Sequence, residues 1–361
     1  MKRRTLFGIW RIAVFVIFIL VDGCVEKIQF DIPTPESQMF LEGMISDAPG
    51  PYIVKVSLGL DLNKDSVVRM PVQKLKLKLY DDHGNTESLI ETAPGDYYTG
   101  GVIRGQVGYS YHITIETPDG KIFESEPDLM KPTGEIEMIR YEFDARQKVE
   151  SFGQVKNDVY NVLIDAEAVP GDNNYVRWRF RGTYKVVTSP QFYWRYALGF
   201  PRWEPWICSG VVVVPNNIIE TNPPPAYTGP PLPGGLQGKL STVFDCTCCT
   251  CYVTQFESIP QLSDGQLILG NQFRNVTVGQ IPINTETFFD RYLVEVDQMS
   301  LTKSAFDFFK LIRAQKEGTS SLFQPPSGEI RGNIKPVNNN SMIVGLFWAT
   351  SITTKSLFIY L

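Results

Sequence analysis

The sequence has few of the residues on which common catalytic and metal-binding motifs depend. Only two histidines, His83 and His112, occur among 361 residues, so a histidine-rich metal centre is excluded and a histidine-based triad has little to draw on. The motifs Gly-x-Ser-x-Gly and His-Glu-x-x-His and the Walker phosphate loop are absent. We therefore expect a non-catalytic protein without metal or cofactor, although a carboxylate pair assembled by the fold would leave no local motif.

Positive charge is also scarce. The formal net charge is −5, and it becomes −8 once the four basic residues and one acidic residue of the N-terminal leader are left out. This balance disfavours a nucleic-acid partner. With 43% hydrophobic and 20% charged residues the chain has an ordinary globular composition, and its length fits two domains.

Residues 1–23 have the features of a lipoprotein signal peptide. A basic start precedes an apolar run at 12–21, and Gly23-Cys24 follows. Ten apolar residues are too few to cross a bilayer, which takes about 20 in a helix. Gly23-Cys24 resembles a lipobox, although Asp22 departs from the usual small or apolar residue, and a plain secretory signal is the alternative.

Acylation of Cys24 would anchor the mature chain to a membrane. Residues 25–27 (Val-Glu-Lys) include no Asp at the second mature position. By analogy with bacterial sorting rules, this favours the outer membrane, with surface exposure left open. Residues 24–36 are expected to be a tether.

Residues 37–130 are predicted to form an immunoglobulin-like β-sandwich. Leu75, Leu77 and Leu79 alternate with lysines, as a half-buried strand requires. Similar runs recur between turn residues at 39–43, 52–58, 109–116 and 121–125. His112 lies within one of these runs, so we interpret it as a strand residue without a catalytic role.

Residues 131–361 are predicted to form a second β-rich domain, which makes the fold mainly all-β. Further alternating runs lie at 135–141, 160–166 and 174–180, and the tail returns to strand at 342–347. One amphipathic helix is expected between Ser300 or Thr302, which can cap its start, and Gly318, which ends it.

Residues 188–260 form an excursion rich in aromatic residues, proline and cysteine. Proline lacks the donor that a sheet ladder needs, so this segment is not expected to form a regular central sheet. Its aromatic and arginine residues either form an exposed binding surface or pack as a small satellite core. These residues are Tyr193, Trp194, Arg195, Tyr196, Arg202, Trp203 and Trp206.

The same excursion holds the five cysteines that remain beside Cys24: Cys208, Cys246, Cys248, Cys249 and Cys251. In an exported chain one or two structural disulfides are the favoured interpretation, and a bridge from Cys208 to the cluster would close a loop of about 40 residues. A soft-metal thiolate site and a redox or intermolecular thiol are the alternatives. A calcium loop beginning at Asp61 is not expected, because Ser66 and Val72 replace the required Gly and Glu.

Several segments together resemble a Bacteroidetes lipoprotein family known as domain of unknown function 4249. The resemblance spans nearly all of the mature chain. It is carried by residues 41–47, 95–98, 292–300, 308–310, 324–326, 330–334 and 344–347. It implies an outer-membrane lipoprotein whose partner is a TonB-dependent transporter, and it supplies no catalytic residues.

These observations favour a non-catalytic surface lipoprotein that helps a TonB-dependent transporter capture or admit a ligand of unknown identity. The excursion at 188–260 is the expected contact region. A structural or adhesive envelope lipoprotein is the main alternative, and a hydrolase with an unrecognised site is a third.

Overall fold

The computed structural model describes residues 38–59, 70–150, 153–170, 174–187, 196–197, 200–201, 211–215, 238–242, 250–263, 272–284, 287–318 and 330–360. In these ranges the strands form four sheets of three or more strands, and the single helix is α2 (Lys303–Gly318). The prediction of a mainly β fold with one helix near the C-terminus is therefore confirmed. No helix in the described part of the chain is long and apolar enough to span a membrane. The predicted leader, the tether and Cys24 lie outside it.

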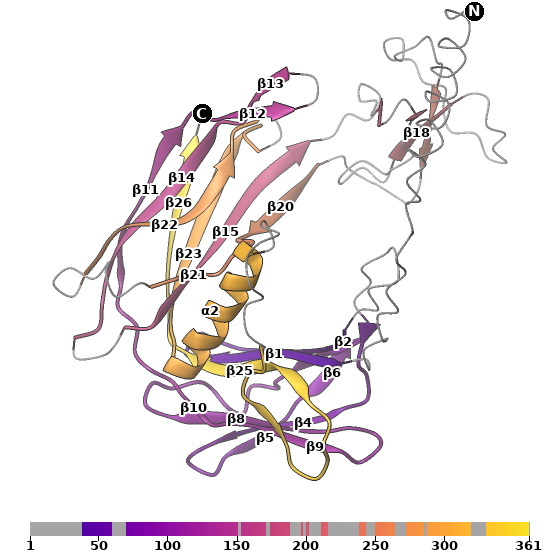
Figure 1. Ribbon diagram of the computed structural model, residues 1–361, viewed down its shortest axis with the longest axis vertical. Coiled ribbons are helices and arrows are strands. Elements are labelled where there is room, and N and C mark those ends of the chain that lie inside the picture. The colour runs from indigo at the N-terminus through magenta and orange to yellow at the C-terminus, as the bar shows by residue number, and fades with distance from the viewer. Residues whose placement is uncertain are drawn as a thin grey trace, which may run out of the picture.

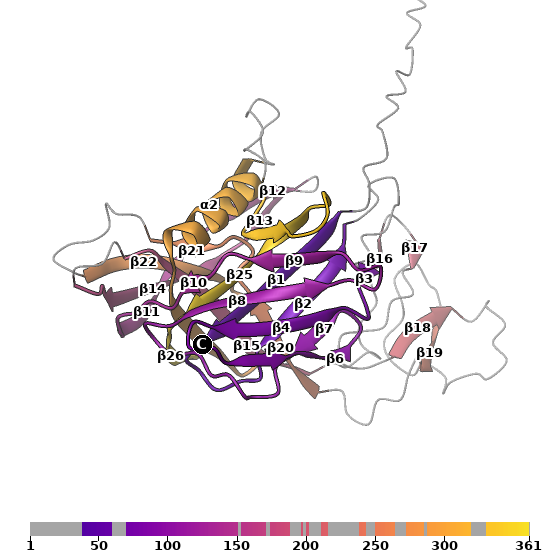
Figure 2. The same ribbon diagram turned by 90° about the horizontal axis from the view of Figure 1, so that it is seen from below.

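The first sandwich consists of two six-stranded sheets around one apolar core. One sheet has the order β25-β1-β2-β7-β6 with β3 beside β2, and the other has the order β24-β9-β8-β4-β5 with β10 beside β8. Seen from below, β4, β8 and β9 lie in front of β1 and β2 (Figure 2). The strands are β1 (Met39–Ser46), β2 (Ile53–Leu58), β3 (Met70–Pro71), β4 (Lys76–Asp81), β5 (Thr86–Ser88), β6 (Ile90–Ala93), β7 (Asp96–Tyr98), β8 (Ser110–Glu116), β9 (Ile122–Ser125), β10 (Asp128–Leu129), β24 (Ile334–Pro336) and β25 (Ile343–Thr350).

Sequence alternation explains how this core forms. Leu77 and Leu79 on β4 point into it while Lys76 and Lys78 are exposed, as the two-residue period of a strand requires. His112 lies on β8 with its ring stacked on Tyr80 at 4.8 Å, which agrees with its interpretation as a strand residue. The immunoglobulin-like assignment of this sandwich stays a prediction.

Two strands from the end of the chain complete the first sandwich. β25 pairs in parallel with β1, from Met39 opposite Ile343 to Ser46 opposite Thr350, and β24 pairs with β9. Gly345 allows this contact, because any side chain there would overlap the carbonyl group of Leu41. The first sandwich therefore includes strands that lie beyond residue 130, the predicted end of the N-terminal domain.

The second sandwich packs the sheet β11-β14-β22 against the sheet β20-β15-β23-β26, with β21 beside β15. The fully buried Gln298 connects the sheets: it accepts a hydrogen bond from Trp178 Nε1 (2.7 Å) and donates to the carbonyl oxygens of Gly134 (2.9 Å) and Glu167 (3.1 Å). The strands are β11 (Ile136–Asp144), β14 (Val159–Glu167), β15 (Val176–Val187), β20 (Thr250–Phe256), β21 (Gln261–Leu262), β22 (Gln272–Pro282), β23 (Arg291–Ser300) and β26 (Ile352–Tyr360), and a separate hairpin joins β12 (Gln147–Glu150) to β13 (Gly153–Lys156).

The predicted excursion contains more regular structure than expected. β20 lies within its predicted limits and β21 follows directly after them, and both pair with β15 in the second sandwich. The segment from 250 onward can join a sheet because the cluster of prolines in the excursion ends before it. Two short hairpins also occur here, made by β16 (Tyr196–Ala197) with β17 (Phe200–Pro201) and by β18 (Val211–Pro215) with β19 (Gly238–Thr242).

Helix α2 lies in the angle between the two sandwiches (Figure 1). Thr302 caps it by accepting a hydrogen bond from the backbone N–H of Ala305 at 3.3 Å, and the Thr302 hydroxyl donates to Asp128 of the first sandwich at 2.6 Å. The buried side of the helix forms a third apolar core with residues of both sandwiches. The members of this core are Leu262, Leu301, Ala305, Phe309, Leu346 and Trp348.

Candidate functional site

A pocket of about 690 Å³ opens where α2 meets the two sandwiches. We call it the junction pocket. The first sandwich contributes β1, β2 and β25, the second contributes β15 and the segment after β20, and α2 closes one side. Its volume is in the range of small-molecule sites.

Most of the lining is apolar. On β25, Val344, Leu346 and Trp348 face the pocket, while the alternate residues Ile343 and Phe347 fill the core of the first sandwich. On α2, the lining residues Phe308, Ile312 and Gln315 recur at spacings of four and three, so they share one face of the helix. Phe40 on β1 completes this surface and is 40% exposed.

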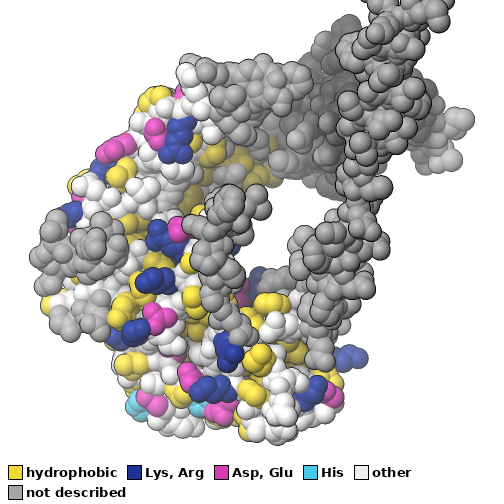
Figure 3. Space-filling model, in the orientation of Figure 1, with side chains coloured by type: hydrophobic (Ala, Val, Ile, Leu, Met, Phe, Trp, Pro, Cys, Tyr) yellow, Lys and Arg dark blue, Asp and Glu magenta, His cyan; other side chains and the backbone are white. Residues whose placement is uncertain are grey.

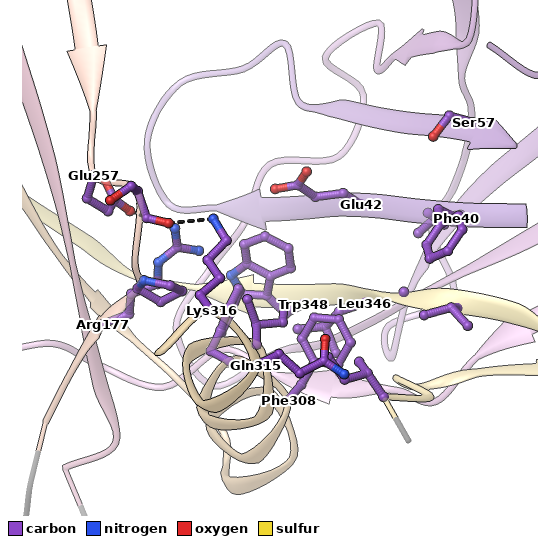
Figure 4. A pocket seen from close by; sticks show the side chains of 18 of the residues that line it. Phe40, Glu42, Ser57, Arg177, Glu257, Phe308, Gln315, Lys316, Leu346 and Trp348 are labelled. Atoms are coloured by element: carbon purple, nitrogen blue, oxygen red, sulfur yellow. Dashed lines mark hydrogen bonds and ion pairs between the residues drawn. The ribbon is translucent and has the colours of Figure 1, made fainter. Parts of the chain in front are cut away.

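One end of the junction pocket is polar, and we call it the polar end. Arg177 on β15 donates to Glu257 at 2.8 Å, and the two side chains are only 14% and 7% exposed. The second carboxylate oxygen of Glu257 accepts the backbone N–H of Phe180 at 3.1 Å. Lys316 of α2 donates to the carbonyl oxygen of Ser258. Figure 4 shows Glu257, Arg177 and Lys316 together at this end.

Two aromatic rings, those of Phe309 and Trp348, pack beside the polar end. The guanidinium group of Arg177 lies over the ring of Phe309, 4.5 Å from its centroid, and Phe309 meets Trp348 edge to face at 5.2 Å. Within the described structure, Arg177 Nε and Trp348 Nε1 are buried donors without a hydrogen-bond partner. Buried polar groups are normally hydrogen-bonded, so two unsatisfied donors beside one pocket are an unusual arrangement.

A second hollow of about 430 Å³ adjoins the junction pocket. Glu42, Arg177, Glu257 and Trp348 line both. Phe256 on β20, which is 62% exposed, lines the second hollow. The two hollows therefore meet at the Arg177–Glu257 pair.

The residues predicted to bind a partner fall mainly outside the described structure. Tyr196 belongs to β16, and nothing is described of its side chain. The predicted surface residues Tyr193, Trp194, Arg195, Arg202, Trp203 and Trp206, and the cysteines Cys208, Cys246, Cys248 and Cys249, lie among undescribed residues. The binding surface at 188–260 therefore stays a prediction.

Cys251 is the one member of the cysteine cluster in the described ranges. It lies on β20, partly buried against the core of the second sandwich, and its sulfur is disulfide-bonded. No bridge joins two described residues, so the predicted pairing with the other cysteines stays untested.

Burial shifts the pKa values of several ionisable groups in the described structure. In this part of the chain no three His, Cys, Asp or Glu residues are grouped as metal ligands would be. Burial raises the pKa of the Tyr292 hydroxyl well above its usual value, and burial also raises the pKa of Asp128, which connects α2 to the first sandwich. On the face seen in Figure 3, basic, acidic and apolar side chains are interspersed, without a large field of one sign.

Fold and site together define a β-protein of two sandwiches with a ligand-sized pocket at their junction. The sequence matches the family described as Domain of unknown function (DUF4249) over residues 25–356, and the chain belongs to that family. No curated protein matches the chain, and no solved structure does. The lipoprotein and Bacteroidetes attributions stay predictions.

Proposed function

We propose that this chain is a non-catalytic, lipid-anchored outer-membrane protein that captures a ligand for a TonB-dependent transporter. The observation that supports this proposal is the junction pocket, which has the size and the mainly apolar lining of a small-molecule site. Its most buried carboxylate, Glu257, already accepts hydrogen bonds on both oxygens. Such a carboxylate positions neighbouring groups and is poorly suited to exchange protons with a substrate.

The proposed anchor would keep the pocket close to the membrane. Gln38, at the rim of the pocket, follows Cys24 by 14 positions. An extended chain spans at most about 3.5 Å per residue, so the rim would lie within about 50 Å of the lipid. That distance suits a protein that passes a ligand to a partner in the same membrane.

Purification from detergent-solubilised outer membranes tests the partnership. An affinity-tagged full-length chain should bring down a transporter barrel in about equal amount, because an accessory protein needs a stoichiometric partner. Recovery of the folded, lipidated chain without any barrel would refute the partnership and support the structural or adhesive alternative. The Cys24→Ser variant serves as the matched control, since it keeps the folded part of the chain and lacks the proposed anchor.

A further inference from the structure

We propose that the junction pocket binds an uncharged, mainly apolar small molecule, which lies between α2 and the strands β1 and β25. This inference rests on the proposed role of the pocket in ligand capture. It adds the chemical class of the ligand and the surfaces that hold it. Two observations support it: apolar side chains line the pocket from three elements, and the charges of the described lining cancel.

The apolar walls of the pocket are accessible to a ligand. Phe40 projects from β1 and is 40% exposed. Phe308 and Ile312 on α2 and Val344 on β25 are partly exposed. A bound molecule can therefore touch these side chains and remove apolar surface from water. A strongly polar molecule would lose its hydration there without gaining hydrogen bonds, since these side chains offer none.

The walls rest on a packed core, so the pocket is formed before a ligand arrives. Phe308 meets Phe309 edge to face, with ring centroids 5.7 Å apart, and Phe309 packs in the same way against Trp348. Phe309 and Trp348 are only 4% and 3% exposed. Binding to such a preformed pocket orders few side chains and therefore loses little affinity to their entropy.

The charged residues of the lining balance one another. Arg177 and Glu257 form an ion pair at 2.8 Å, and the ammonium group of Lys316 donates to the carbonyl oxygen of Ser258. Together with Glu42, the described lining holds two acidic and two basic side chains, which sum to zero charge. A charged ligand would give up its hydration without meeting an excess of opposite charge, so an uncharged ligand fits better.

The rim of the pocket accommodates an uncharged polar group on the ligand. Gln38 and Gln315 belong to the lining, and Gln315 is exposed. A side-chain amide both donates and accepts hydrogen bonds, so it suits a hydroxyl or a carbonyl group. The proposed class therefore includes alcohols, ketones and esters with apolar bodies, and it excludes ions.

Competition among three ligands with the same alkyl chain tests the uncharged class on the purified protein. At neutral pH decanol is uncharged, decanoate is anionic and decylammonium is cationic. N-phenyl-1-naphthylamine, an uncharged dye that fluoresces in apolar surroundings, reports their displacement. Decanol should displace the dye at about a tenfold lower concentration than either ion, and the two ions should agree within about threefold. An ion at least as effective as decanol would overturn the uncharged class.

Glu42→Gln tests the charge balance, because it leaves the described lining with one net positive charge. Decanoate should then displace the dye at about a threefold lower concentration than in the wild-type chain, decylammonium at about a threefold higher one, and decanol at the same one. Glu142→Gln, on β11 and outside this lining, is the matched control and should change none of them. Unchanged displacement by both ions in Glu42→Gln would contradict the assignment of the site.

Two further variants locate the dye. Gln315→Trp should obstruct the pocket and weaken dye binding about tenfold, whereas Lys310→Trp, exposed on the same helix but outside the described lining, should not. Phe40→Ala removes an exposed wall and should weaken the dye about threefold. Its control is Phe143→Ala, at an exposed position of β11. Dye binding that survives both Gln315→Trp and Phe40→Ala in folded proteins would overturn the proposal.

These measurements need no transporter, so they are independent of the co-purification test. A chain that binds decanol in this pocket but recovers no barrel would keep the ligand class and lose the partnership. A chain that recovers the barrel but prefers one of the ions would keep the partnership and lose the ligand class.

Discussion

Asp128 offers the most direct test of how α2 and the pocket are held in place. It lies on β10, is 5% exposed, and accepts hydrogen bonds from the Thr302 hydroxyl at 2.6 Å and from the Ala349 N–H at 2.9 Å. Thr302 caps α2, and Ala349 belongs to β25. One carboxylate therefore joins three of the elements around the junction.

Asp128→Ala removes both hydrogen bonds and leaves the N–H of Ala349 buried without a partner. Hydrogen bonds to a charged group contribute about 1.5 to 3 kcal/mol each, and removal of the buried charge offsets part of their loss. We therefore expect the free energy of unfolding of Asp128→Ala to be lower by about 2 to 4 kcal/mol. Asp128→Asn can still accept from Ala349 and can donate to Thr302, so it should lose less than about 1 kcal/mol at neutral pH.

The pH dependence follows from the raised pKa of Asp128, whose main cause is burial. A carboxyl group whose folded pKa exceeds its unfolded value binds its proton more tightly in the folded state. Its contribution to stability is present below the unfolded pKa of about 3.9 and is lost as the pH rises through the folded pKa. The wild-type chain should therefore lose stability relative to Asp128→Asn as the pH rises above about 4.

Urea denaturation of the wild-type chain and both variants at pH 4 and pH 7 measures these differences. A change below about 0.5 kcal/mol for Asp128→Ala would refute the structural role of the carboxylate, since that is the ordinary range for surface substitutions. Equal losses for the alanine and asparagine variants would show that the hydrogen bonds are not what matters.

Four further predictions concern the anchor, the cysteines, the excursion and the second core. Cys24→Ser should release the chain from the membrane fraction, and continued membrane association without any partner would contradict acylation. Intact mass under non-reducing conditions should be about 2 or 4 Da below the reduced mass, whereas five free thiols or bound zinc or copper would contradict the disulfides. Trp203→Ala and Trp206→Ala should each weaken partner binding by about 2 kcal/mol with little change in melting temperature, while a stability loss of about 3 to 5 kcal/mol with binding intact would indicate a satellite core. Gln298→Leu should lower the free energy of unfolding by at least about 3 kcal/mol, because it leaves the Trp178 N–H and two carbonyl groups buried without hydrogen-bond partners. An unchanged free energy of unfolding in denaturation experiments would contradict this expectation.

Local periodicity was enough to predict many of the longer strands and the helix. β4, β8 and β15 alternate apolar and polar residues, and α2 lies between the predicted cap Thr302 and Gly318. These features depend on neighbours within a few positions, which is the range over which sequence patterns are informative. β20 was missed because its cysteine-rich start follows a long proline-rich stretch.

The junction pocket could not be predicted in the same way. Arg177 and Glu257 come together through the second sandwich, while Phe40 and Trp348 come together through the pairing of β1 with β25. No local pattern reports a parallel pairing between the two ends of a chain. The one usable signal was the motif Val344-Gly345-Leu346-Phe347, whose glycine the structure explains by its close approach to β1.

The strands from the end of the chain also determine when folding can be completed. β24, β25 and β26 all lie within residues 334–360, and they cover the edges of β9, β1 and β23 respectively. A chain that becomes available for folding N-terminus first would keep all three edges bare until residues 334–360 had emerged. Bare edges invite pairing with other chains, so a chaperone would have to protect nearly the full length of each molecule. A copy that lacks these residues would be a substrate for proteolysis instead of a smaller working protein.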